Sequence, residues 1–132
     1  MSEKARIYIH YDAKTDYLEV SSHKGEVTAS DIGDGIFELR VKGGRGKLVG
    51  HAVTDAASRF GDLDFLDPFV KFAVQVKVAR LKRGLTQAKI AKRMGIGLLP
   101  YQRLESGSNN PTLKTILKLK KILPEISLDL VA

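Results

Sequence analysis

Amide and basic side chains gather between residues 80 and 105, and they are the groups in this chain best suited to chemistry. Gln87 follows Thr86 at an expected helix start, where free backbone N–H groups and the helix dipole favour a phosphate. Nearby lysines and arginines would add phosphate contacts that do not depend on base sequence. These residues are Lys82, Arg83, Lys89, Lys92 and Arg93. The pattern favours nucleic-acid binding, while a solvated basic surface is the alternative for each cation taken singly.

Residues that could support catalysis or bind a metal are scattered. The three histidines, His10, His23 and His51, lack the spacing of metal ligands, and zinc held between facing strands is a minor alternative. Asp12 and Asp16 resemble a carboxylate pair, but aspartate is common in turns. Residues 43–46, Gly-Gly-Arg-Gly, predict a hairpin turn, because no Lys-Ser/Thr helix start follows as in a phosphate loop. We expect no enzymatic activity, no metal and no cofactor.

The charges divide the 132 residues into two unlike halves. Through Pro68 there are 9 lysines and arginines against 12 aspartates and glutamates, a net charge of −3. From Phe69 onward there are 13 against 3, a net charge of +10. A basic half joined to a mildly acidic one is typical of a polyanion-binding domain with an appended module. The absence of cysteine, of a signal peptide and of a long apolar run fits a cytoplasmic protein that does not enter a membrane.

The second half must form helices to position these side chains. Asp67 and Pro68 predict a helix start, Thr86 predicts a second one, and Gly84 and Gly95 predict helix ends. Helices are expected over residues 68–83, 87–94, 98–106 and 113–123. The alternation in residues 126–130 predicts a short terminal strand.

The first half is predicted to form a sheet. Strands are expected over residues 6–11, 17–21, 36–42 and 48–53, with a loop at 31–35 and a short helical or loop connection from 55 to 64. The predicted fold class is α+β: a four-stranded antiparallel meander (residues 1–62) followed by a helical domain of four to five helices (residues 63–132).

The helical half resembles the Cro/phage-repressor helix-turn-helix family, often called XRE. The resemblance is carried by LKRGLTQAKIAKRMGI at residues 81–96, QRLESG at 102–107 and NPTL at 110–113. It implies that the third helix enters the DNA major groove. It also implies that Ile90, Ile96 and Leu104 share a core around Ala91 and Gly95, and that Arg80 and Glu105 form a structural ion pair.

The same resemblance implies a set of DNA-contacting residues. By family position, Gln87 bridges phosphate and the recognition helix, and Arg103 reads bases; an arginine can bind guanine O6 and N7 together. The full set is Thr86, Gln87, Lys89, Gly97, Leu98, Leu99, Tyr101, Gln102 and Arg103. The sequence departs from the family at Leu98 and Leu99, where polar residues are usual. These leucines would contact a thymine methyl group or a protein partner. Pro100 fits only within the first turn of the helix.

Two looser resemblances concern the biological role. YQRLE at residues 101–105 and NPTLKT at 110–115 are similar to the C-terminal domain of HicB-type antitoxins, which bind a toxin and repress their own operon. DYLEV at 16–20, GIFEL at 35–39 and GKLVGHAVTDA at 46–56 resemble a small β-meander family of unknown function. We therefore expect a homodimeric, sequence-specific regulator of double-stranded DNA, of antitoxin type, with a cognate toxin as a candidate partner. The alternative is a protein-interaction adaptor whose helix-turn-helix does not read DNA.

Overall fold

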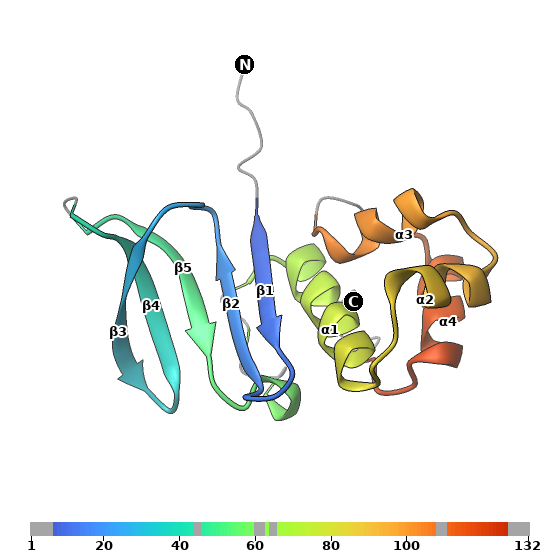
Figure 1. Ribbon diagram of the computed structural model, residues 1–132, viewed down its shortest axis with the longest axis horizontal. Helices are drawn as coiled ribbons and strands as arrows, with labels where there is room; N and C mark the ends of the chain where they lie inside the picture. The colour runs from blue at the N-terminus through green and yellow to red at the C-terminus, as the bar shows by residue number, and fades with distance from the viewer. Residues whose placement is uncertain (1–6, 44–45, 60–62, 64–65, 108–110, 127–132) are drawn as a thin grey trace, which may run out of the picture. The chain divides into compact units, whose positions relative to one another are not determined.

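The computed structural model of the protein describes residues 7–43, 46–59, 63, 66–107 and 111–126. The chain divides into two compact units, Met1–Ser58 and Arg59–Ala132. The first contains the strands and a short 3₁₀ helix, and the second contains the α-helices (Figure 1). The predicted α+β class is confirmed.

The N-terminal unit is a five-stranded antiparallel sheet. Its strands are β1 (Tyr8–Asp12), β2 (Tyr17–Ser21), β3 (Val27–Gly33), β4 (Ile36–Val41) and β5 (Leu48–Val53), followed by the 3₁₀ helix η1 (Ala56–Ser58). The strand order is β1-β2-β5-β4-β3. The expected four-stranded meander is wrong in two respects, because there is a fifth strand and because β5 lies between β2 and β4 instead of at an edge.

The additional strand, β3, explains the first error. The sequence predicts a loop at residues 31–35, but in the structure β3 extends to Gly33 and is almost wholly exposed. Asp34 and Gly35 both have positive φ, +57° and +73°, and join Gly33 to Ile36 across a two-residue turn. Asp-Gly is a preferred pair for such hairpin turns, since both residues tolerate this backbone conformation. The turn therefore pairs β3 with β4 despite the polar sequence of β3.

The central position of β5 depends on Gly50. A side-chain carbon at this position would lie 2.1 Å from the carbonyl oxygen of Val20 in β2. Only glycine permits the two backbones to approach so closely. Asp16 adds a second tie, since its carboxylate accepts hydrogen bonds from the Tyr11 hydroxyl and from the backbone N–H of Ala57 in η1. The carboxylate of Asp16 thus has a structural role at the end of the sheet.

The described residues of the C-terminal unit form four α-helices: α1 (Pro68–Lys82), α2 (Gln87–Met94), α3 (Leu98–Glu105) and α4 (Leu113–Ile122). Side chains cap three of the helix starts, with Asp67 accepting from the N–H of Phe69, Thr86 from Lys89 and Thr112 from Thr115. The predicted first and last residues of all four helices agree with the structure within one residue. The starts are predictable because each capping residue lies next to the helix that it caps. Of the expected terminal strand, Ile126 is buried but outside any strand, and residues 127–130 lie outside the described residues.

The core of the helical unit joins all four helices. Ile90 and Ala91 of α2, Leu104 of α3 and Ile116 of α4 belong to one buried cluster, and Ile96 packs against it. The predicted shared core is therefore present and holds α2 and α3 as one body. In the part of the chain that the structure describes, no helix combines the length and apolar character needed to cross a membrane.

Candidate nucleic-acid interface

A tight turn between α2 and α3 sets the angle of the third helix. Gly95 has φ +72°, in the left-handed region that glycine adopts without strain. The N–H of Gly95 bonds to the carbonyl of Lys92 at 3.1 Å, and that of Ile96 bonds to Ala91 at 3.0 Å. Gly97 is the N-cap residue that precedes α3, and Pro100 falls in the first turn of the helix, where no intrahelical hydrogen bond is lost. This is the local geometry of a helix-turn-helix.

A buried ion pair ties α1 to the end of α3. Arg80 donates from Nε to Glu105 Oε2 at 2.6 Å and from Nη2 to Glu105 Oε1 at 3.1 Å. A third donor, Arg80 Nη1, bonds to the carbonyl of Leu85 at 2.8 Å. The Tyr101 hydroxyl donates to Glu105 Oε2 at 2.5 Å. The Glu105 carboxylate thus accepts several hydrogen bonds, as a buried charge requires, and it fixes α3 to α1.

Gln87 extends this network to the surface. Its Nε2 donates to Glu105 Oε1 at 3.2 Å, and its Oε1 accepts from Gln102 Nε2 at 3.1 Å. The resemblance implied that Gln87 contacts the recognition helix, and both bonds run from Gln87 to α3. The sequence did not identify Glu105 and Gln102 as the partners, which lie 18 and 15 residues away. An open hollow of about 560 Å³ lies beside this helix start and is lined by Thr86, Gln87 and Leu98 among others.

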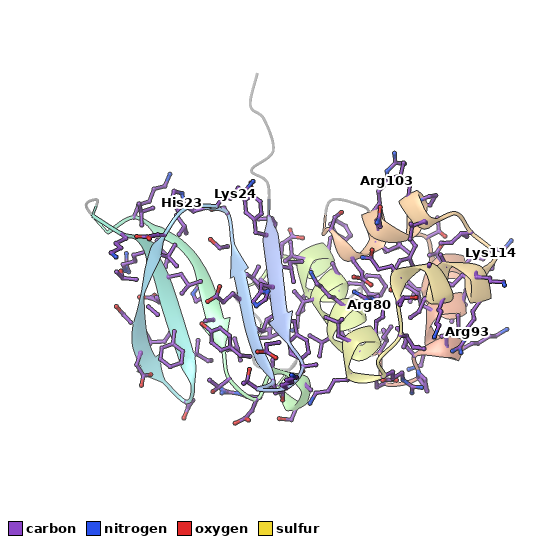
Figure 2. The ribbon with its side chains drawn as sticks, in the orientation of Figure 1. His23, Lys24, Arg80, Arg93, Arg103 and Lys114 are labelled. Atoms are coloured by element: carbon purple, nitrogen blue, oxygen red, sulfur yellow. The ribbon has the colours of Figure 1, made fainter. Side chains whose placement is uncertain are left out.

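Pro100 and four further residues of α3 are exposed, and those four share the outward face of the helix: Leu98, Leu99, Gln102 and Arg103. The two leucines are 46% and 58% exposed, a high fraction for large apolar residues. Figure 2 shows the Arg103 side chain pointing away from the helix. We expected Tyr101 to contact DNA, but its side chain is fully buried in the core and does not reach the surface. Burial and the neighbouring Glu105 charge raise the pKa of Tyr101 well above its ordinary value.

Four of the five expected phosphate-binding cations fall into two groups, and the fifth, Lys82, is exposed at the end of α1. Lys89, Lys92 and Arg93 are exposed on α2. Arg83, in contrast, forms a two-pronged ion pair with Glu125, with both N–O distances 2.9 Å. The hydrogen bonds from Arg83 hold the pKa of the Glu125 carboxyl below its usual value. Arg83 is therefore engaged with another segment of its own unit, and the α2 cations are the better candidates for phosphate contact.

The sheet brings together two histidines that the sequence left apart. His10 and His23 line, with Glu19 and other residues, a cavity of about 200 Å³. His51 does not line this cavity. Burial lowers the pKa of His51, and the negative charge of Glu38 offsets part of this effect. Within the described residues, no group of three histidine or carboxylate side chains has the arrangement of a metal site.

Comparison with known proteins supports the assignment of the C-terminal unit. Residues 76–131 match the family model described as helix-turn-helix, a span that includes α2, α3, α4 and the end of α1. No curated protein and no solved structure matches the chain. Over these residues the C-terminal unit is similar to helix-turn-helix domains, the kind of domain with which regulators bind DNA. The similarity of the N-terminal half to a β-meander family stays a prediction.

Proposed function

We propose that this protein is a sequence-specific DNA-binding transcriptional regulator that inserts α3 into the major groove of double-stranded DNA. The observation that carries the proposal is the four-residue outward face of α3, held from behind by the Arg80–Glu105 pair. A reading helix must be rigid, because base contacts depend on the register of its side chains.

Backbone contacts would orient this helix. The first N–H groups of α2 have no partner within the helix, and Gln87 stands at that position with Lys89 nearby. Arg103 would bind a base edge or a phosphate from the outward face of α3. Phosphate contacts supply affinity, and contacts from α3 to base edges supply specificity.

Fluorescence anisotropy on the chain's own upstream DNA and on a scrambled duplex, over a salt series, tests this function. We expect about 10³-fold tighter binding to the upstream DNA and a steep salt dependence. Arg103→Ala should reduce the difference in affinity between the two duplexes. Lys14→Ala, which removes an exposed cation from the other unit, should leave that difference unchanged. Equal, weak binding to both duplexes would overturn the proposal.

In the finer form of the proposal, the protein is a cytoplasmic, homodimeric antitoxin that represses its own promoter. The two-unit organisation supports this form, because one unit can bind a partner while the other binds DNA. β1 and β3 are the outer strands of the sheet, and outer strands present backbone groups that can pair with another chain. A dimer would read two half-sites about 34 Å apart.

Light scattering of the purified chain, combined with co-expression of a small neighbouring gene, tests this finer form. A dimeric mass, rescue of growth from the neighbour's toxicity and tighter promoter binding by the complex would support it. A monomer, or a neighbour that is harmless when expressed alone, would leave a regulator of another kind.

The exposure of Leu98 and Leu99 favours a second candidate, a protein-interaction adaptor. An adjacent apolar pair on a surface often marks a protein contact. Replacing both residues with glutamine separates the two functions. Tighter DNA binding would indicate a DNA-reading helix weakened by the two leucines, whereas loss of binding to a protein partner would indicate the adaptor.

A further inference from the structure

The hydrogen bonds around Glu105 fix the orientation of two amide groups. The Glu105 carboxylate is ion-paired with Arg80 and therefore only accepts hydrogen bonds. Gln87 must present its NH₂ group to Glu105, which turns its carbonyl toward Gln102. Gln102 must in turn present its own NH₂ group to Gln87. The direction of this relay is thus set by the buried charge.

The relay leaves a defined pattern at the exposed end. The Gln102 amide uses one of its two N–H hydrogens on Gln87 and keeps its oxygen and one hydrogen for another molecule. An acceptor beside a donor complements adenine, which offers the N6 amine and N7 in the major groove. Guanine offers two acceptors there, so it matches this pattern less well.

The leucines beside Gln102 define a second, apolar element. Leu98 lies one helical turn before Gln102, and Leu99 one turn before Arg103, so the four side chains share one face. The C5 methyl of thymine is the apolar group that the major groove exposes. Covering it would also remove part of the exposed surface of the two leucines from water.

We propose that α3 selects a half-site containing adjacent A·T and T·A pairs, with Leu98 and Leu99 on thymine methyl groups and the Gln87-held amide of Gln102 on adenine. This proposal rests on the proposed function, since it requires α3 to lie in the major groove. It adds the base composition of the target and assigns Glu105 a positioning role through Gln87.

Selection of bound duplexes from a random-sequence pool by the full chain tests the proposal. We expect the enriched half-site to contain thymine and adenine in neighbouring pairs. Synthesis of this site with deoxyuridine in place of thymine removes only the methyl group. Each contacted methyl should contribute about fourfold to affinity. Gln102→Ala should lower the preference for the adenine about 5- to 150-fold.

Leucine variants provide the control. With Leu98→Ala and Leu99→Ala together, the thymine and deoxyuridine duplexes should bind equally. Leu117→Ala, which truncates a comparably exposed leucine on α4 (45% exposed), should keep the wild-type difference. An enriched site without such pairs, or one insensitive to deoxyuridine, would overturn this inference and leave the regulator standing. If no sequence is enriched, the proposed function itself fails.

Discussion

Glu105 is the residue on which the polar contacts of the helical unit converge. Its two carboxylate oxygens accept from Arg80, Tyr101 and Gln87. The same carboxylate therefore holds α3 against α1 and orients the amide groups at the surface. A substitution in this cluster affects both folding and recognition, so the two effects must be measured separately.

Removal of Arg80 tests the structural part of this role. We expect Arg80→Ala to lower the free energy of unfolding by about 3–5 kcal/mol, because Glu105 would be left buried without its partner. Urea denaturation followed by circular dichroism measures this change. Arg103→Ala, an exposed arginine, should change stability by less than about 0.5 kcal/mol. Similar effects from the two variants would contradict the structural role of the pair.

The buried hydroxyl of Tyr101 should make the free energy of unfolding fall at alkaline pH. Its pKa is raised by burial first and then by Glu105, so the folded state holds this proton more tightly than the unfolded state does. The resulting stabilisation is complete below the ordinary tyrosine pKa of about 10 and is lost as pH rises above it. Urea denaturation at pH 9 and pH 11 should show a larger loss in the wild type than in Tyr101→Phe. Equal losses would show that the buried hydroxyl makes no contribution.

At the scale of elements, the turn between α2 and α3 determines where the reading face points. A side-chain carbon at Gly95 would have no atom within 4 Å, so space does not require glycine at this position. Glycine is favoured there only because of its φ of +72°. At Gly97, φ is −71°, and a side-chain carbon would lie 3.4 Å from Cδ of Pro100. The two glycines of one turn therefore have different requirements.

Alanine substitutions at these two glycines test that difference. Gly95→Ala should destabilise the unit by about 1–2 kcal/mol, because a left-handed conformation is strained for alanine. It should also weaken binding to the upstream DNA, since relief of the strain would change the angle of α3. Gly97→Ala should be close to neutral in both measurements. A neutral Gly95→Ala would mean that the turn does not depend on this conformation.

At the scale of the whole molecule, charge separates the two units. The net charge of +10 lies from Phe69 onward, and two of the three carboxylates in that stretch, Glu105 and Glu125, are already paired with arginines. The remaining acidic residue, Asp129, lies outside the described residues. The helical unit thus has cations in excess for phosphate binding, whereas the sheet unit does not.

Charge reversal on each unit tests this asymmetry. Lys89→Glu should weaken binding to upstream and scrambled DNA alike and should reduce the slope of log affinity against log salt by about 1 or more. Lys14→Glu makes the same change of charge on the sheet unit and should leave the slope unaltered. If both variants reduce the slope equally, DNA binding is not confined to the helical unit.

The helices and their order follow from local signals in the sequence. Asp67, Thr86 and Thr112 cap backbone groups no more than three residues away, and Gly95 ends α2 through its own backbone conformation. Such signals need no knowledge of the rest of the fold. The resemblance to the repressor family implied the Arg80–Glu105 pair, which the structure contains. The DNA contacts that it implied stay a prediction, and Tyr101 is buried instead of exposed.

The contacts between residues distant in the sequence depend on the packing of each unit. The position of β5 between two hairpins depends on the approach of Gly50 to Val20, and the engagement of Arg83 depends on Glu125, which is 42 residues away. The relay from Glu105 through Gln87 to Gln102 likewise joins two helices. Local patterns specify a residue's own element and the face it occupies. They do not specify the side chain that packing places opposite it, because that choice is made by the whole unit.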